Sequence, residues 1–305
     1  MKEIKGTFLS SDEKNQIAYY IYEPDEPRAV IQLSHGMCEY VERYAAHAEY
    51  FCSQGFVFAG NDHLGHGETA KNSEELGFME RSCDLTDDLS KFTDILKERY
   101  PKLPIFLLGH SMGSFILRDY MTKYPEKING AILSGTAGPG DPTALGKILA
   151  SLLGKIYGSH HRSRLLFSMS LGAYSKKFGK DAPPEAWISS DSNVWETYKN
   201  DKFCHFVFTV YGYRVLFDVL GRVSKKAWAK AVPSDLPVLI VSGKDDPVGK
   251  FGKGVRKVEK RLSDAGVKDL SCVIFEGGRH ELFNEAEPIR SESYKTVTDW
   301  INERI

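Results

Sequence analysis

Short apolar runs alternate with amphipathic stretches along the first half of the chain. The later runs are continuously apolar, as is typical of strands covered on both faces. We expect strands in five ranges: 16–22, 29–34, 56–61, 105–109 and 130–134. Between two of them, apolar residues recur at helical spacing: Leu85, Leu89, Phe92 and Leu96. This alternation predicts an α/β fold, with a mostly parallel central sheet flanked by helices.

The alternation of strand and helix patterns stops between residues 136 and 235. No convincing core strand occurs there, and helical patterns dominate. Asp141 and Pro142 predict a helix N-cap followed by a proline at the first helical position. The earlier rhythm then resumes, with strands expected at 238–242 and 270–275 and helices at 255–265 and 288–304. We therefore expect one core domain, built from residues 1–135 and 236–305, with a helical cap (lid) inserted at 136–235.

Two apolar sets stand out in this insertion. The first is a stripe at helical spacing: Leu145, Ile148, Leu149, Leu152, Leu153, Ile156 and Tyr157. The second is a concentration of aromatic residues: Phe167, Tyr174, Trp187, Trp195, Tyr198, Phe203, Phe206, Phe208, Tyr211 and Tyr213. They could wall an apolar substrate pocket, pack as the core of their own domain or, with Lys147 and Lys155, rest on a membrane surface. The sequence leaves these three alternatives open.

Composition narrows the class of protein. The 305 residues are 42% hydrophobic, which is enough for a full core, and 40 basic against 41 acidic residues leave a net charge of −1. That balance argues against nucleic acid or an anionic membrane as the main partner. The five cysteines form no CxxC pair, which favours free thiols over a disulfide or zinc framework. With no signal-peptide pattern and no long apolar run, we expect a cytoplasmic protein of undetermined oligomeric state.

Candidate chemistry centres on residues 109–113, which read GHSMG. An apolar run enters this GxSxG motif and a helical pattern leaves it, so Ser111 is expected on a strained strand-to-helix turn at the carboxyl edge of the sheet. A serine hydroxyl needs a base to become nucleophilic. The order in this fold is serine, acid, histidine. His280 is the candidate base, because it lies in a Gly-rich loop after the last strand.

The acid and the oxyanion donors follow from similar reasoning. Asp245 and Asp246 both follow a strand, and we favour Asp246 because the proline after it restrains the turn. The acid would hold the imidazole in the correct tautomer. The backbone N–H of Met112, directly after the nucleophile, is one expected oxyanion donor. The second is the N–H of Met37, in the loop after the strand at 29–34.

Five motifs in order resemble the monoacylglycerol lipase and lysophospholipase branch of the α/β-hydrolases, also called the serine aminopeptidase S33 or hydrolase-4 group. They are residues 35–39 (HGMCE) with Arg43 and Tyr44, 62–68 (DHLGHGE), 109–113 (GHSMG), 243–248 (GKDDPV) and 279–285 (RHELFNE). Tyr40 stands where this branch usually has histidine. The resemblance selects Asp246 as the acid and gives Glu39, Asp62, His63 and His66 a loop-shaping role.

The resemblance implies an α/β-hydrolase fold and a serine ester hydrolase that acts through an acyl-enzyme, without cofactor or metal. The expected substrate is a monoacyl lipid, either a monoacylglycerol or a lysophospholipid, or a related ester. Two alternatives stay open. An aminopeptidase of the same fold would need acids in the cap to bind an ammonium group, for which Glu185 and Glu196 are candidates. A non-catalytic ligand-binding protein would be expected to lack one of the three catalytic residues.

Overall fold

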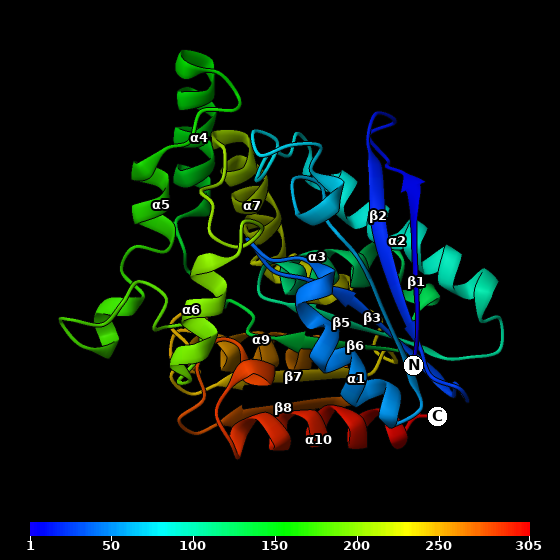
Figure 1. Cartoon of the computed structure of the whole chain (residues 1–305). Helices are drawn as coiled ribbons and strands as arrows, with labels where there is room; N and C mark the ends of the chain where they lie inside the picture. Colours follow the sequence, from blue (N-terminus) through cyan, green and yellow to red (C-terminus); the bar gives the residue numbers. More distant parts are fainter.

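The computed structural model describes residues 1–305, and an eight-stranded sheet runs through its centre (Figure 1). The strands are β1 Lys2–Leu9, β2 Gln16–Glu23, β3 Ala29–Ser34, β4 Phe56–Asn61, β5 Ile105–His110, β6 Gly130–Ser134, β7 Val238–Gly243 and β8 Leu270–Phe275. Their order across the sheet is β1-β2-β4-β3-β5-β6-β7-β8. Strands β3 to β8 are parallel, whereas β1 and β2 pair in antiparallel fashion at one edge. The predicted mostly parallel sheet is therefore confirmed.

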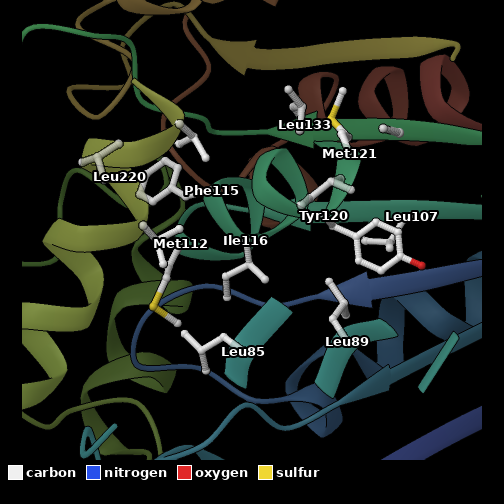
Figure 2. Close-up of a cluster of buried hydrophobic side chains, with 14 of the residues drawn as sticks. Leu85, Leu89, Leu107, Met112, Phe115, Ile116, Tyr120, Met121, Leu133 and Leu220 are labelled. Carbon is white, nitrogen blue, oxygen red and sulfur yellow. The ribbon is translucent and has the colours of Figure 1, made fainter. Parts of the chain in front are cut away.

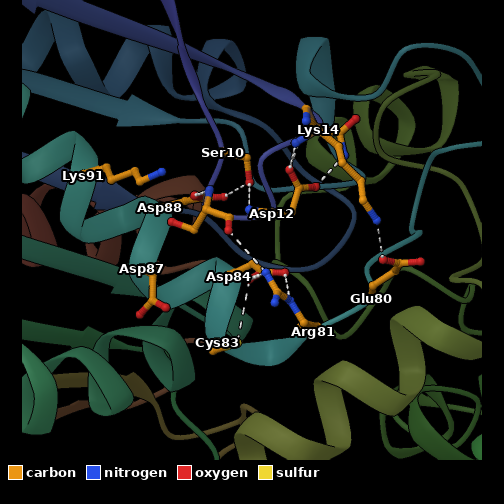
Figure 3. Close-up of polar contacts among 12 residues, drawn as sticks. Ser10, Asp12, Lys14, Glu80, Arg81, Cys83, Asp84, Asp87, Asp88 and Lys91 are labelled. Carbon is orange, nitrogen blue, oxygen red and sulfur yellow. Dashed lines mark hydrogen bonds and ion pairs between the residues drawn. The ribbon is translucent and has the colours of Figure 1, made fainter.

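Strand β1 is absent from the sequence prediction. It is an edge strand in which no residue is fully buried, so its sequence carries no run of core residues. Strand β1 pairs with β2, and the turn between the two strands is bound by a helix. Asp88 of the helix at 82–99 accepts hydrogen bonds from the Ser10 hydroxyl (2.7 Å) and the Ser11 amide (2.5 Å) in that turn. Figure 3 shows these contacts beside the ion pair of Arg81 with Asp84.

Five helices cover the two faces of the sheet: α1 Ala45–Ser53, α2 Ser82–Arg99, α3 Met112–Lys123, α9 Lys253–Asp264 and α10 Ile289–Asn302. Five more lie between β6 and β7: α4 Thr143–Tyr157, α5 Arg164–Ser170, α6 Ser192–Asn200, α7 Val210–Val223 and α8 Lys226–Ala231. We call residues 136–235, which add no strand to the sheet, the insertion. None of the helices combines the length and the apolar character needed to cross a bilayer.

The core forms on both faces of the sheet. Helices α1 and α10 pack on one face, and α2, α3 and α9 pack on the other. In Figure 2, Leu89 of α2, Ile116 and Tyr120 of α3 and Leu107 of β5 meet in the second layer, and all four are fully buried. Burying a side chain of this size stabilises the fold by about 1.5–3 kcal/mol. Helix α3, the helix that follows the GxSxG motif, is thus held firmly from two sides.

The insertion is joined to the sheet domain through a shared core. Val215, Val219 and Leu220 of α7 belong to the same buried cluster as Phe115 of α3. Figure 2 shows Leu220 beside Phe115. Helix α4 lies in turn against α7 at close range, because a Cβ added at Gly146 would come within 2.8 Å of the Phe217 ring. The insertion therefore stands above the carboxyl edge of the sheet, on the side of α3.

One prediction for the insertion is corrected. Asp141 is not the N-cap of α4: the helix begins one residue later, with Pro142 in the capping position, and the Asp141 carboxylate pairs with Lys250 at 2.8 Å. The α4 stripe is divided: Leu149 and Leu153 are partly buried and pack against the core, whereas its other large apolar residues are exposed. Leu145, Ile148, Leu152 and Ile156 are 67%, 64%, 52% and 61% exposed, because the close contact with α7 uses the opposite, glycine-containing side of the helix.

Candidate active site

Ser111 lies in the sharp turn between β5 and α3. Its backbone has φ 51° and ψ −118°, a conformation that costs a non-glycine residue about 1–3 kcal/mol. Close packing maintains the turn, because a Cβ at Gly113 would lie 1.8 Å from the carbonyl oxygen of Ser34. The Ser111 amide also donates to the carbonyl of Ser134 at 3.0 Å. The turn thus places Ser111 in the wall of a pocket at the carboxyl edge of the sheet.

His280 and Asp246 meet beside that pocket, although they come from different loops. The Nδ1 atom of His280 lies 3.0 Å from Oδ2 of Asp246, and both side chains are buried. The other carboxylate oxygen of Asp246 accepts from the Val248 amide at 2.8 Å, which fixes its orientation. Asp245 makes no hydrogen bond to His280; its amide donates to the Gly278 carbonyl instead. Of the two neighbouring acids, the fold brings Asp246 to the histidine.

Ser111 and His280 line the same pocket, but no hydrogen bond joins the Ser111 hydroxyl to the imidazole. The Nε2 atom of His280 has no hydrogen-bond partner within the protein. Catalytic hydrogen bonds are often long without substrate and tighten when it binds. Ser111 and His280 therefore line one cavity, and Asp246 is hydrogen-bonded to the histidine, but the serine and the histidine are not hydrogen-bonded to each other.

Two backbone amides that line the pocket with Ser111 are candidates for binding an anion. Met37 and Met112 both line the pocket. The Met112 amide is the first N–H of α3, which has no partner inside the helix. The Met37 amide donates no hydrogen bond within the protein. Unpaired amides of this kind are what an oxyanion requires.

The pocket is mainly apolar: 15 of its 25 lining residues are hydrophobic. Part of its apolar lining comes from α3, the end of α5 and α7, and includes Phe115, Leu171, Leu216, Phe217 and Leu220. Of the aromatic residues singled out in the insertion, three line it, namely Tyr174, Trp187 and Tyr198. The α4 stripe does not: α4 contributes Thr143 and Gly146. The alternative that the stripe walls the pocket is therefore wrong.

A buried ionic network, which the sequence reasoning missed, lies beside Ser111. Glu39 contacts Nδ1 of His110 at 2.7 Å and Arg43 at 3.1 Å, and Arg43 bridges to Glu281 at 2.7 Å. The Tyr44 hydroxyl and the Gly36 amide also donate to Glu39. His110 is the second residue of the GxSxG motif and Glu39 follows Met37 by two positions, so both lay within motifs already recognised.

This network shifts the pKa values of its members. Burial disfavours the charged form of Glu39, but the attraction of His110 and Arg43 outweighs it and lowers the pKa of the carboxyl well below its ordinary value. Burial alone would lower the pKa of His110, yet the facing Glu39 carboxylate raises it instead. Both shifts favour the charged forms, the Glu39 carboxylate and the His110 imidazolium, beside the turn that carries Ser111.

The remaining motif residues form hydrogen bonds within the loops. Asp62 accepts from the amides of Val41 and Glu68 at 2.8 and 2.9 Å. His63 contacts the Ser34 hydroxyl at 3.1 Å through Nε2, and its amide donates to His35 at 3.0 Å. Burial lowers the pKa of His66 to about 3, so this side chain is neutral near pH 7. None of the three lines the pocket, in agreement with the loop-shaping role expected for them.

The sheet order, the strand-to-helix turn with a serine at its tip, and the helical insertion after β6 define an α/β-hydrolase. The family comparison makes this assignment more specific. Residues 25–287 match the family described as serine aminopeptidase, S33, and the chain belongs to that family.

Curated relatives and solved structures agree with this family. The chain is 27% identical over 287 residues to a monoacylglycerol lipase of Mycolicibacterium smegmatis, covering 94% of this chain and 92% of that protein. It is 26% identical over 286 residues to a monoglyceride lipase of Rattus norvegicus, covering 92% and 84%. A thermostable carboxyl esterase from Bacillus coagulans, solved with glycerol, superposes with a TM-score of 0.92 at 29% identity and covers 100% and 99%.

Proposed function

We propose that this protein is a serine ester hydrolase whose substrate is a monoacyl lipid, either a monoacylglycerol or a lysophospholipid. The observation that carries the proposal is the convergence of Ser111 and the His280–Asp246 pair on one apolar pocket. The names of the relatives support the substrate class, because lipases of monoacylglycerols match nearly the whole chain.

In the proposed reaction, the Ser111 hydroxyl attacks the ester carbonyl carbon while Nε2 of His280 takes its proton. The amides of Met37 and Met112 donate to the oxyanion that forms on the carbonyl oxygen. Asp246 accepts from Nδ1 of His280 and stabilises the imidazolium. His280 then protonates the departing alcohol oxygen as the C–O bond breaks. In the second half, water gives a proton to His280 and attacks the acyl carbon. His280 then returns this proton to Oγ of Ser111 as the bond between Oγ and the acyl carbon breaks, which releases the fatty acid and regenerates the hydroxyl.

The pocket lining supports a long acyl chain. Its apolar wall between α3 and α7 offers Phe115, Leu216 and Phe217 to methylene groups. Each methylene removed from water contributes about 0.8 kcal/mol, so a chain of many carbons would bind far more tightly than an acetyl group. Several polar side chains line other parts of the pocket, among them Glu39 and Glu281.

An aminopeptidase has less support from the same pocket. Binding a free N-terminus needs a carboxylate without a cation of its own. Glu39 and Glu281 line the pocket, but both are paired with Arg43. Asp141 also lines it and is paired with Lys250. The cap acids Glu185 and Glu196 do not line the pocket. Each pocket acid therefore already has a positive partner.

A single set of assays tests the reaction. The purified protein is first treated with a fluorophosphonate probe, which labels an activated serine. It is then given monoacylglycerols, lysophospholipids, p-nitrophenyl esters of increasing chain length and an aminoacyl anilide. We expect labelling at Ser111 and hydrolysis that is fastest for monoacyl lipids. Absence of labelling would favour the non-catalytic ligand-binding alternative, and preference for the anilide would favour the aminopeptidase.

We also propose that the insertion rests on a lipid surface through α4 and α5. Large apolar side chains are exposed together there: Leu145, Ile148, Leu152, Ile156, Tyr157, Leu165, Phe167 and Met169. Exposed apolar patches of this kind mark interaction sites. Residues 142–180 also contain seven Lys or Arg residues and no Asp or Glu. Each cation near an anionic lipid surface contributes about 1 kcal/mol, so the charge fits an anionic membrane despite the neutral whole chain.

Vesicle sedimentation tests this surface. We expect the protein to bind vesicles of phosphatidylcholine mixed with phosphatidylglycerol, and to bind pure phosphatidylcholine more weakly. Binding should fall as salt is added, because exposed charges are screened. Equal binding to both vesicle types would remove the electrostatic part of the proposal, and no binding to either would remove all of it.

A further inference from the structure

The loop that carries His280 depends on the insertion for part of its backbone hydrogen bonding. It follows β8, an edge strand with only β7 beside it. A loop after an edge strand lacks neighbours on one side, and buried amides need partners. Residues 186–190 of the insertion supply them. The His280 amide donates to the carbonyl of Trp187 at 3.3 Å, and the Glu281 amide donates to that of Ile188 at 2.8 Å. We call residues 186–190 the strap.

Two charged side chains fasten the strap to this loop. Arg279 donates to the carbonyls of Ala186 and Ser189 at 2.5 and 2.9 Å. Glu285, which is fully buried, accepts from the Ser190 amide at 2.9 Å and from the Arg279 amide at 2.6 Å. It also accepts from the Ser190 hydroxyl. Both residues belong to the motif around His280, and the proposed reaction gives neither of them a chemical step.

The strap also places an aromatic ring directly on the imidazole. The Trp187 ring centroid lies 4.9 Å from that of His280, and the ring of His110 packs at 4.9 Å as well. Tyr174, also from the insertion, packs edge-on against Trp187 at 5.2 Å. With Asp246 bound at Nδ1, the imidazole is restrained by three side chains, and one of them belongs to the insertion rather than to the sheet domain.

We propose that Trp187, fastened by the strap to Arg279 and Glu285, is a positioning residue that holds the His280 imidazole in its reactive orientation. This inference rests on the proposed function, in which His280 is the base. A small displacement of a catalytic group costs a large factor in rate, about 100-fold for 1 Å. The insertion would then contribute to the chemical step itself as well as to the walls of the pocket.

Because Trp187 also lines the pocket, the test must separate positioning from substrate contact. A p-nitrophenyl acetate assay does this, since an acetyl group is too short to use the acyl wall. We expect Trp187→Leu to lower kcat for acetate about 10-fold or more with little change in KM, and to slow fluorophosphonate labelling by a similar factor. Trp187→Phe keeps an aromatic ring and should retain most of the activity. If Trp187→Leu changes only the KM for long-chain esters, Trp187 is part of the pocket wall and the inference is wrong.

A second variant tests the strap away from the pocket. Glu285 does not line the cavity, so Glu285→Gln cannot alter substrate contact. We expect it to lower kcat for acetate about fivefold, because the amide replaces one of the two acceptor oxygens, of which one binds Ser190 of the strap and the other binds the Arg279 amide. Glu287→Gln is the matched control, because Glu287 is exposed, two positions away and bonded only to Arg290 and Ser291. Equal kcat in Glu285→Gln and the control would overturn the role of the strap.

The two proposals fail in different ways. If the unaltered protein neither binds fluorophosphonate nor hydrolyses esters, the proposed function is wrong. If the unaltered protein is active but Trp187→Leu and Glu285→Gln are equally active on acetate, the reaction stands and only the positioning inference fails. Thermal melting of each variant shows whether a loss of rate comes from unfolding, and Trp187→Phe supplies the comparison should the leucine variant not fold.

Discussion

Helices α3 and α4 follow consecutive strands of the sheet, but α3 buries its apolar side chains and α4 exposes most of them. In α3, ten consecutive residues from Met112 to Met121 are buried. In α4, only Gly146 and Ala150 are buried, and the leucines and isoleucines on the outer side face solvent. The contrast teaches that apolar periodicity alone does not reveal what a helix packs against. In the sheet domain the apolar side chains stabilise the fold, whereas on α4 they are available for contact with another surface.

The contrast extends to charge. Charged groups near the catalytic turn are buried and paired, as Glu39, His110 and Arg43 show. Charges on the outer part of the insertion are of one sign and mostly exposed. The sheet domain thus uses ion pairs to hold a local geometry. Residues 142–180 of the insertion carry only positive charges, of which Lys147 is paired with Asp218. Four substitutions test this division, beginning with the largest expected effect.

The largest effect is expected in the sheet domain, when the proposed nucleophile is removed. If the proposed function is correct, we expect Ser111→Ala to lower kcat for ester hydrolysis by about six orders of magnitude, as in a serine protease that loses its nucleophile. The melting temperature should change little, because the hydroxyl makes no hydrogen bond that the fold needs. A loss of less than tenfold would discard the assignment of Ser111.

Removing the charge beside His280 should have the next largest effect. Asp246→Asn keeps the shape of the side chain but favours the wrong imidazole tautomer, and we expect kcat to fall by about 10⁴-fold. Asp245→Asn is the matched control, because Asp245 makes no hydrogen bond to His280. Its kcat should stay within about twofold of the unaltered protein. Similar losses in both variants would contradict the choice of Asp246.

The buried ion pair gives a pH-dependent prediction. We expect Glu39→Gln to lower the free energy of unfolding by about 3 kcal/mol, because His110 and Arg43 lose their buried partner. The lowered pKa of Glu39 stabilises the fold above its ordinary value of 4.5, and this is lost as the pH falls through the lowered pKa. The raised pKa of His110 stabilises the fold below 6.5, and this is lost as the pH rises through the raised pKa.

Both contributions are therefore complete only between pH 4.5 and 6.5. Urea unfolding at pH 5.5 and pH 9 measures the difference between the unaltered protein and Glu39→Gln. We expect that difference to be larger at pH 5.5, and to persist in part at pH 9 because Arg43 keeps its charge. The same difference at both pH values would show that His110 is not charged in the folded protein.

The smallest effect on stability is expected at α4. Leu152→Ala should change the free energy of unfolding by less than about 0.5 kcal/mol, because the side chain is already exposed to water. Leu117→Ala in α3 is the matched comparison, and its buried side chain should cost about 2–5 kcal/mol. Leu152→Glu should weaken binding to anionic vesicles without loss of acetate hydrolysis. Destabilisation by Leu152→Ala comparable to that of Leu117→Ala would contradict the claim that the exposed apolar side chains of α4 do not stabilise the fold.

Much of the fold was predictable because its signals are local. Mainly apolar runs marked β2 to β8, and the spacing of Leu85, Leu89, Phe92 and Leu96 marked α2. Strand β1 was missed, since an edge strand without buried residues leaves no such run. The start of α4 was misplaced by one residue: Asp141, the predicted N-cap, lies before the helix and pairs with Lys250, a residue more than 100 positions away. Local patterns do not reveal such distant partners.

By itself, the sequence determined the α/β architecture and the identity of the candidate serine, acid and histidine, because turn chemistry and strand patterns depend on near neighbours. Only the tertiary structure decided which side of α4 faces water, and that Trp187 packs on the imidazole. These are contacts between segments far apart in the chain. They depend on how whole elements dock against one another, and no pattern confined to one segment encodes that.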